Sequence, residues 1–431
     1  MNHWTFRFIC FLEEITMQHP EKHNHLLIYA HLRNYPNNCK KPKAHLGNLQ
    51  QRNIPFVLFI FSLFFICILQ TPASAVENQT FTCGIILPLS GEMNASGTAL
   101  LQGIEIATDE INNNGGAAGH QISLRIADDE GSPSKALSLF NEMKNDGIPA
   151  VIGSYSTSIT LPMAEETKNS EDIILISPRA NGEPLYGISP RFYQINAPFF
   201  TVTQFVSDWL SYTAERVAII YIDDEYGRSV LSGLESGLKT HSIPISGSFP
   251  ITNEDTDFSG IFNTILNDAP DSIVISVYDS RQIPIIRNLS DAGYRGQVIL
   301  TETGYINLLE NEESEFLSKF SLFMIPSHSY LVPGERTDRF VKSFKGRFGQ
   351  DPERTIAGYG YDSMMVLAYA IRLGSENGTI SADSIQKGLD ESRYYGITGP
   401  KTFDSYHTVP PVLDRWFFKD DKFILLMTSL T

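Results

Sequence analysis

The sequence predicts an α/β protein with two lobes, each a mostly parallel sheet flanked by helices, joined by hinge crossovers. Short apolar runs alternate with segments of helical periodicity, the pattern of parallel sheets with right-handed crossovers. This alternation occurs twice, in blocks 80–198 and 199–326. The pattern then changes to three successive helices, at about 336–348, 356–373 and 382–389. The two similar blocks predict the two lobes.

The first block starts with the apolar strand FTCGIIL, which ends at Pro88. The next segment has apolar residues at helical spacing and stops at NNNGG, a strong helix terminator. Ser132 and Pro133 are a typical cap and first residue of a further helix. The elements expected in this block are strands at 81–87, 122–126, 149–152 and 173–176, and helices at 99–112, from Pro133 onward, and between the strands 149–152 and 173–176.

The second block repeats the pattern. Its expected strands are 217–221, 243–249, 272–277, 298–300 and 322–325, and its expected helices are 199–212, 230–238, 258–266 and 283–292. Strand-like pieces close the chain at 401–403, 412–418 and 423–427.

The three late helices are more than the second sheet needs, so we expect some of them to return and cover the first lobe. The sequence therefore predicts one lobe from 80–198 plus 327–395 and the other from 199–326 plus 396–431. The crossings between them would act as hinges and leave a cleft at the ends of the strands.

The N-terminal region has the features of an export signal. A basic flank precedes an apolar run at 54–69, and the small residues Pro-Ala-Ser-Ala end at Ala75. This predicts a signal-peptide core and cleavage site at 54–75, because the run is shorter than the roughly 20 residues of a membrane-spanning helix. Residues 1–53 are an atypical extension, which we interpret as an over-extended gene start. A genuine cytoplasmic extension with a retained anchor is the alternative.

Charge and cysteine content exclude several classes of protein. Beyond Ala75 the chain has 26 Lys and Arg against 46 Asp and Glu, a net charge of −20. This acidity argues against nucleic acid or an anionic membrane as a partner. Only Cys83 remains in that part, so no intramolecular disulfide is expected. No catalytic or metal motif is present, so we expect no enzyme, no cofactor and no metal.

Two neighbouring turns, each after a predicted buried strand, are rich in small and hydroxyl residues. Ser156, Thr157 and Ser158 follow the first strand, and Arg179, Ala180 and Asn181 follow the second. Neighbouring parallel strands release their loops at one edge of a sheet, where ligands bind. A helix that begins in such a loop offers free N–H groups to an anion. The pair of turns is therefore suited to a carboxylate, although such clusters are more often simple turns and caps.

The strand ends of the second block offer a complementary set. Tyr226, Tyr278 and Glu302 each lie at or just past a predicted strand. Together with the two turns they describe a site for a zwitterionic α-amino acid. The acidic runs 128–130 and 223–225 could bind a hard cation. We interpret them instead as solvated loops or helix-start carboxylates.

These residues also carry a resemblance to a known family. From about 81 to 418 the sequence resembles the type I periplasmic binding proteins of the leucine/isoleucine/valine-binding kind, the extracytoplasmic receptors of branched-chain amino acid ABC importers. The matching motifs are IILPLSG (85–91), GIEIATDEINNNGG (103–116), ADDEGSP (127–133), VIGSYSTSIT (151–160), ISPRANGE (176–183), YIDDEYGRS (221–229), TDFSG (256–260) and ITGP (397–400).

The resemblance implies a role for each candidate residue. The turn from Ser156 to Ser158 would hold the ligand carboxylate, and Thr157 stands at the family's carboxylate-binding serine. The remaining assignments are a second turn at Ala180 and Asn181, cleft tyrosines at Tyr226 and Tyr278, and an ammonium acceptor at Glu302.

Three residues depart from the family pattern. Asn181 replaces a hydroxyl residue, Arg179 replaces a small one, and Ser96 stands where an aromatic residue would line the side-chain pocket. A larger or more polar ligand would fit these changes. We interpret Arg179 as a surface residue. If it points inward instead, it would pair with a second carboxylate.

The sequence thus predicts an exported, monomeric solute-binding protein. It would capture an amino acid or amide-like ligand and deliver it to an ABC permease in the membrane. A sensor of the same fold, which reports to a receptor partner, is the alternative.

Overall fold

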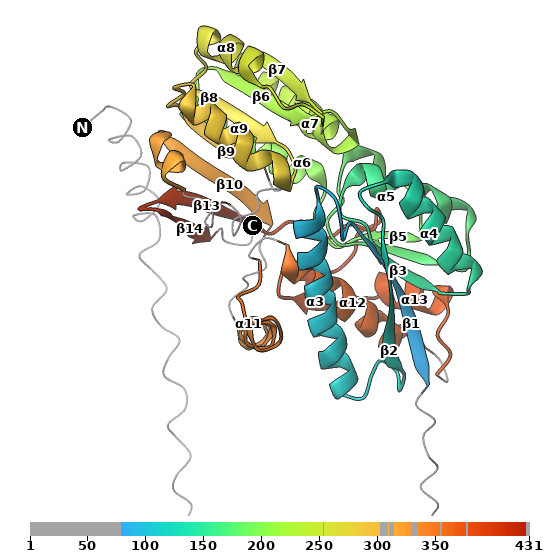
Figure 1. Ribbon diagram of the computed structural model, residues 1–431. Coiled ribbons are helices and arrows are strands. Elements are labelled where there is room, and N and C mark those ends of the chain that lie inside the picture. Colours follow the sequence, from blue (N-terminus) through green and yellow to red (C-terminus); the bar gives the residue numbers. More distant parts are fainter. Residues whose placement is uncertain are drawn as a thin grey trace, which may run out of the picture. The chain divides into compact units, whose positions relative to one another are not determined.

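The computed structural model describes residues 79–252, 254–301, 309, 314–328, 334–353, 356–375 and 378–427. These residues all belong to one compact unit. The expected extension, signal-peptide core and cleavage site, and the expected ligand residue Glu302, lie outside the described residues. The mixed α/β architecture with mostly parallel sheets is confirmed (Figure 1).

The first sheet has five strands in the order β2-β1-β3-β4-β5, and all of its pairings are parallel. Its strands are β1 (Thr80–Leu87), β2 (Gln121–Asp128), β3 (Ala150–Gly153), β4 (Ile174–Ser177) and β5 (Phe192–Gln194). The helices between them are α3 (Asn94–Asn113), α4 (Pro133–Asn145) and α5 (Thr157–Glu166), with 3-10 turns at Thr167–Asn169 and Glu183–Leu185.

The second sheet has seven strands in the order β14-β13-β10-β9-β8-β6-β7. Its strands are β6 (Val217–Ile222), β7 (Ile245–Ile251), β8 (Ser272–Ser276), β9 (Gln297–Leu300), β10 (Leu322–His328), β13 (Leu413–Lys419) and β14 (Lys422–Met427). Its helices are α6 (Phe199–Thr213), α7 (Glu225–Thr240), α8 (Ser259–Asp268) and α9 (Asp279–Asp291), with a 3-10 helix at Ser314–Lys319. The strands up to β10 pair in parallel, and β13 and β14 add an antiparallel edge.

Expected and observed elements differ mainly at their ends. Helices α3 and α7 each begin five residues before the expected start. Strand β5 was not expected, because three residues carry too little periodicity to distinguish a strand from a loop. Strand β10 continues past Pro326, where we expected it to stop. It does so because the antiparallel strand β13 pairs with it there, beyond the stretch that pairs with β9, so the missing N–H of Pro326 interrupts no bond to β9.

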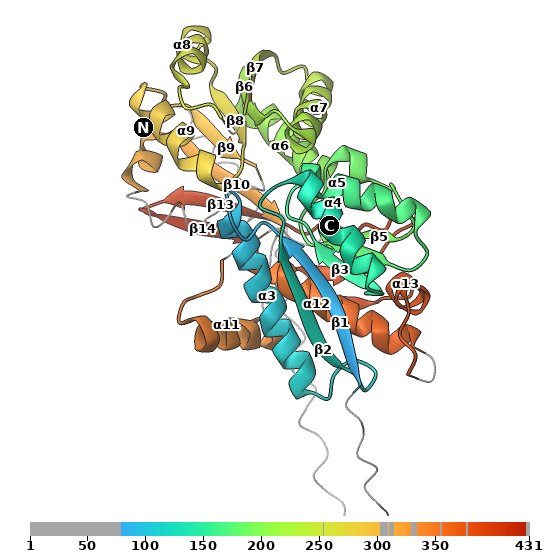
Figure 2. The same cartoon turned by 45° about the vertical axis from the view of Figure 1, so that its right-hand side comes forward.

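The late helices are α11 (Glu335–Phe348), α12 (Ala357–Gly374) and α13 (Ala382–Asp390). Helix α12 packs along α3, and α13 packs against α12 (Figure 2). A two-stranded hairpin follows, from β11 (Tyr394–Gly396) and β12 (Gly399–Lys401). The chain thus returns to the helices of the first sheet before it enters β13.

A buried carboxylate fixes the segment that leads back to the second sheet. Asp362 on α12 has no exposed surface and accepts hydrogen bonds from the backbone N–H groups of Ile397 (3.0 Å) and Thr398 (2.7 Å). Lys401 lies 3.9 Å from the same carboxylate, and its ammonium donates to the carbonyl of Thr398. Burial raises the pKa of Asp362 and lowers that of Lys401. These bonds tie the crossing segment to α12.

His407, further along the chain, contacts β5 of the first sheet. Its carbonyl accepts a hydrogen bond from Gln194 of β5, and its ring stacks on Tyr193 at 4.4 Å between centroids. The predicted lobe limits stay a prediction. These contacts favour a last crossing after residue 408 rather than at 396.

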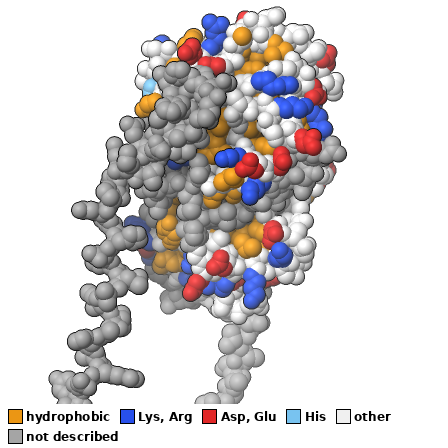
Figure 3. All heavy atoms as spheres, turned by 90° about the vertical axis from the view of Figure 1, so that its left-hand side faces the viewer, with side chains coloured by type: hydrophobic (Ala, Val, Ile, Leu, Met, Phe, Trp, Pro, Cys, Tyr) orange, Lys and Arg blue, Asp and Glu red, His pale blue; other side chains and the backbone are white. Residues whose placement is uncertain are grey.

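Basic and acidic side chains are interspersed on the face shown in Figure 3, without a patch of one sign among the atoms that are not grey. None of the helices within the described ranges is both long enough and apolar enough to span a membrane.

Helices α3 and α12 approach each other closely through two glycines. A Cβ atom added to Gly103 would lie 2.0 Å from the carbonyl oxygen of Ala357, and one added to Gly360 would lie 2.0 Å from that of Leu100. Both obstacles are backbone atoms, which cannot rotate away. The contact between these two helices therefore requires both glycines.

We expect Gly360→Ala to lower the free energy of unfolding by about 1–3 kcal/mol or more, because the added methyl forces the two helices apart. Urea denaturation measures this change. Gly346→Ala is the matched control, since Gly346 is exposed in α11 and its added Cβ meets no atom within 4 Å. The control should be neutral or gain roughly 0.5–1 kcal/mol of helix propensity. If Gly360→Ala and Gly346→Ala change the free energy of unfolding equally, the close approach of α3 and α12 is contradicted.

Candidate functional site

The turn between β3 and α5 is buried although it consists of hydroxyl residues. Ser156 is the N-cap of α5, and its hydroxyl accepts a hydrogen bond from the N–H of Ile159 at 3.4 Å. Ser156 and Thr157 are 3% and 1% exposed. The first turn of a helix carries N–H groups without partners inside the helix and the positive end of its dipole. The turn is therefore suited to an anion, and its role as a carboxylate site stays a prediction.

The turn after β4 is held in place from several sides. The N–H of Ala180 donates to the hydroxyl of Ser177 at 3.0 Å, and the amide of Asn181 donates to the carbonyl of Ala197 at 3.0 Å. Thr157 joins this turn to the first one, because its hydroxyl accepts from the N–H of Gly182 at 3.0 Å. The two turns thus form one structure at the carboxyl ends of β3 and β4.

Arg179 lies inside the protein rather than on its surface. Its side chain is only 5% exposed, and its guanidinium carbon lies 4.9 Å from the centre of the Tyr359 ring on α12. The amide of Asn196 donates to its backbone carbonyl at 3.0 Å. The interpretation of Arg179 as a surface residue is therefore wrong. Arg179 is buried because α12 and the segment after β5, both distant in sequence, enclose its loop.

The second sheet contributes two buried tyrosines. Tyr226 and Tyr278 are each 4% exposed, and their ring centroids are 5.9 Å apart. Tyr278 also lies 6.0 Å from the ring of Tyr155, which belongs to the turn after β3. Aromatic side chains from both sheets therefore meet.

Asp224 was not among the predicted site residues. It is the N-cap of α7 and accepts a hydrogen bond from the N–H of Gly227 at 2.9 Å. Its other oxygen accepts from the hydroxyl of Tyr278 at 2.9 Å and from that of Ser158 at 3.4 Å. Burial raises the pKa of this carboxyl, although the bonds from Gly227, Tyr278 and Ser158 partly oppose the shift.

The interpretation of 223–225 as helix-start carboxylates was thus right for Asp224, although its side chain is partly buried rather than fully exposed. A signal was available, because Asp224 follows β6 at the same sheet edge as Tyr226. The acidic run 128–130 also differs from the expected solvated loop, because one of its carboxylates is buried. Asp129 has no exposed surface, and it accepts hydrogen bonds from the hydroxyl of Ser154 at 2.7 Å and the N–H of Gly131 at 2.8 Å. It supports the start of the turn after β3.

Most of the predicted site residues surround one small cavity of about 20 Å³. Its lining residues are Tyr155, Ser156, Thr157, Arg179, Ala180, Asn181, Tyr226 and Tyr278. Ser158 lies beside it through its bond to Asp224. Such a volume holds about one water molecule. In the described part of the chain, no group of three His, Cys, Asp or Glu side chains is arranged to hold a metal ion.

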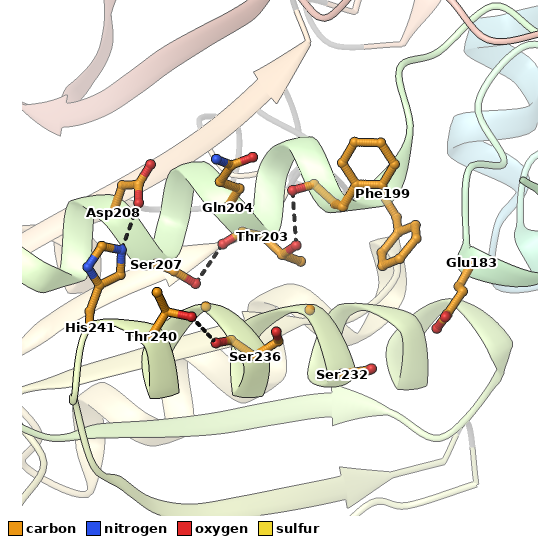
Figure 4. A pocket seen from close by; sticks show the side chains of 13 residues that line it. Glu183, Phe199, Thr203, Gln204, Ser207, Asp208, Ser232, Ser236, Thr240 and His241 are labelled. Atoms are coloured by element: carbon orange, nitrogen blue, oxygen red, sulfur yellow. Dashed lines mark hydrogen bonds and ion pairs between the residues drawn. The ribbon is translucent and has the colours of Figure 1, made fainter.

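A larger hollow of about 430 Å³ lies between α6 and α7 (Figure 4). Gly233 and Gly237 of α7, which line it, lie so close to α6 that an added Cβ would be 2.5 Å from the hydroxyl oxygen of Thr203 and 2.2 Å from that of Ser207. The hydroxyls of Thr203 and Ser207 donate to carbonyls of their own helix. We interpret this hollow as a groove of helix packing, since its polar groups are satisfied locally.

Thr157→Val should lower the free energy of unfolding by about 1–3 kcal/mol, because the buried N–H of Gly182 loses its acceptor. Thr157→Ser keeps the hydroxyl and should cost only about 0.8 kcal/mol for the lost methyl group. Chemical denaturation of both variants checks the difference. Equal losses would show that the bond between the turns contributes nothing.

Comparison with known proteins places this geometry in a family. A sequence model described as periplasmic binding protein matches residues 80–414. The Leu/Ile/Val-binding protein homolog 3 of Brucella melitensis is 25% identical over 222 residues, which cover 51% of this chain and 60% of that protein. The Leu/Ile/Val-binding protein of Escherichia coli K12 is 24% identical over 347 residues, 78% of this chain and 90% of that protein. The match with the first of these relatives thus spans about three fifths of its length.

Solved structures share the fold. The substrate-binding protein LivJ of Streptococcus pneumoniae, in complex with isoleucine, has a TM-score of 0.70 and 20% identity over 81% of this chain and 99% of its own. The leucine-binding protein LivK of Thermotoga maritima has a TM-score of 0.72 and 18% identity over 80% and 98%. A solute-binding protein of R. palustris in complex with benzoate has a TM-score of 0.71 and 17% identity over 81% and 96%. At sequence identities this low, the similarity to these structures shows a shared fold and nothing more. Because the family model covers far more than half of the sequence, the chain belongs to the periplasmic binding protein family.

Proposed function

We propose that this protein is the extracytoplasmic ligand-binding subunit of an ABC importer and that it captures an amino acid between its two sheets. One observation carries the proposal. The hydroxyl-rich turn after β3, the turn after β4 and the tyrosines of the second sheet line the same cavity. Relatives with the matching sequence pattern are Leu/Ile/Val-binding proteins, which supports an amino acid as the ligand.

The ligand carboxylate would bind at the start of α5. Ser156 and Thr157 bring hydroxyl groups there, and the helix N-terminus adds N–H donors and positive potential. Charge-assisted hydrogen bonds of this kind are stronger than neutral ones. This end of the site recognises the part of the ligand that all α-amino acids share.

The ligand ammonium would bind to a carboxylate of the second sheet. Glu302 is the residue that the family resemblance assigns to this role. Asp224 is a second candidate, because its carboxylate already accepts bonds from Tyr278 and Ser158 at the edge of the cavity. We propose that Glu302 makes the main contact and that Asp224 stabilises the closed arrangement.

Binding would require the lobes to move apart and close again. A cavity of about 20 Å³ is too small for an amino acid. The described contacts between the two sides include the bond from the N–H of Glu183 to Ser229 at 2.9 Å, that from Ser158 to Asp224 at 3.4 Å, and the ring contact of Tyr155 with Tyr278 at 6.0 Å. A ligand that bridges both lobes would favour the closed form through the contacts that it makes only there.

The remaining assignments follow from the family. We propose export to the extracytoplasmic side, a monomer in solution, and a membrane permease as the partner that receives the ligand. No catalytic step is assigned. A sensor of the same fold would bind the same ligand and differ only in its partner.

A thermal-shift screen against the twenty amino acids tests the proposal. A ligand at 100 times its Kd stabilises the folded state by roughly 2.7 kcal/mol, so a tight ligand produces a clear rise in Tm. We expect at least one amino acid to do so. If no amino acid shifts Tm, the protein does not bind this class of ligand.

Glu302→Ala should weaken binding of the best amino acid at least tenfold, about 1.4 kcal/mol, when measured by calorimetry. Asp224→Asn should weaken it less, because the side-chain oxygen of asparagine can still cap α7 while its NH2 group can donate to the hydroxyl of Tyr278. Asp223→Asn is the matched control in the same turn, since Asp223 is half exposed and pairs with Arg228. It should bind like the wild type. If Asp224→Asn weakens amino acid binding more than Glu302→Ala does, Asp224 is the main acceptor of the ligand ammonium.

A further inference from the structure

An ion pair joins the elements of the two sheets at a point outside the small cavity. Glu92 lies in the loop between β1 and α3, and Arg281 lies in the first turn of α9. A terminal guanidinium nitrogen of Arg281 is 3.2 Å from a carboxylate oxygen of Glu92. The starts of α3 and α9 face each other in both ribbon views (Figure 1 and Figure 2). Neither residue lines the cavity, so this contact is separate from the proposed ligand site.

Arg281 is oriented by its own lobe. Its other terminal nitrogen donates to the backbone carbonyl of Asp255, between β7 and α8, at 2.7 Å. The Arg281 side chain is 14% exposed, and its Nε is buried without a hydrogen-bond partner among the described residues. A long side chain that is already fixed loses little rotamer entropy when it forms an ion pair. Arg281 is therefore preorganised to meet Glu92 when the lobes close.

The ion pair is a contact of the closed arrangement. Glu92 belongs to the first lobe, whereas Arg281 and Asp255 both belong to the second. Opening would separate Glu92 from Arg281 and leave the bond between Arg281 and Asp255 intact. A contact that exists only in the closed form shifts the equilibrium toward that form.

The size of this effect follows from the exposure of the pair. The Glu92 side chain is 42% exposed, and ion pairs near the surface change an equilibrium by small factors. The contacts at the cavity are hydrogen bonds and a ring contact, whereas Glu92 and Arg281 carry opposite charges. Their attraction is therefore the one that dissolved salt would weaken.

We propose that Glu92 and Arg281 form a latch that holds the closed protein shut and sets how long it retains its ligand. This role in ligand retention rests on the proposed function. The latch touches no ligand and stabilises the closed form after the ligand has bound, so it slows reopening and release. Arg281 and Glu92 are then positioning residues, and they should slow the release of every ligand by the same factor.

Hydrogen exchange of the ligand-free protein tests the latch. Ser156 and Thr157, in the turn after β3, are buried between the lobes. Exchange in this turn therefore follows the population of the open form. We expect Glu92→Gln to speed it roughly threefold, as for a partly exposed ion pair. Arg125→Met is the matched control, because Arg125 pairs with Glu142 within the first lobe. Unchanged exchange in Glu92→Gln would overturn the proposal.

Release of a bound ligand is the second readout. For ligands found by the thermal-shift screen, stopped-flow displacement measures the dissociation rate. Glu92→Gln and Arg281→Met should each raise this rate roughly threefold, by the same factor for every ligand. A factor that differs between ligands would make one of these side chains a ligand contact, and the latch would be wrong.

The double variant Glu92→Gln/Arg281→Met separates the pair from other effects of either substitution. It should release ligand no faster than the single variants, because either change already removes the ion pair. High salt should speed release from the wild type and have less effect on the variants. Additive effects of the two substitutions would overturn the latch. If Arg281→Met folds poorly, Glu92→Gln still tests the proposal, since Glu92 is an exposed loop residue.

The exchange experiment separates the latch from the function on which it rests, because it needs no ligand. If Glu92→Gln speeds exchange and no amino acid raises Tm, the latch stands and the proposed function fails. If an amino acid binds and Glu92→Gln changes neither exchange nor release, the proposed function stands and the latch fails.

Discussion

The hydrogen bond from the N–H of Gly182 to the hydroxyl of Thr157 is the contact on which the first half of the site depends. Strands β3 and β4 run parallel, with Ile152 opposite Ile176, so their following turns leave the same sheet edge. Gly182 allows the approach, because a Cβ there would lie 2.7 Å from the Thr157 side chain. With the turns joined, Ser156 and Thr157 at the start of α5 and the loop residues Arg179, Ala180 and Asn181 line one cavity.

The second half of the site is organised around Asp224. Its carboxylate caps α7, accepts a bond from Tyr278 and meets Ser158 from the other sheet. One side chain therefore stabilises a helix, positions an aromatic wall and contacts the opposite lobe. Burial raises its pKa, so its charge has a cost in the closed arrangement that would be relieved on opening. An equilibrium between two arrangements that differ by a few polar contacts is what ligand-driven closure requires.

The sequence predicted the order and type of nearly every element, because the buried strands are short apolar runs and the helices have clear stripes. Errors occurred where local periodicity is weak. The first turns of α3 and α7 are rich in polar and small residues, so the sequence predicts their starts too late. β5 has three residues. The extension of β10 past Pro326 depends on pairing with β13, far away in the sequence.

The sequence by itself determined which residue types follow the strand ends, and therefore that hydroxyl turns and tyrosines would be available to a ligand. The tertiary structure decided which polar side chains are buried among them. Arg179 turns inward because Tyr359 and Asn196, from other parts of the chain, surround its loop. Asp129 and Asp224 look like surface acids in the sequence, but Asp129 is fully buried and Asp224 is partly buried, where Ser154 and Tyr278 satisfy their oxygens. The burial of a charged group depends on partners distant in sequence, which local pattern does not reveal.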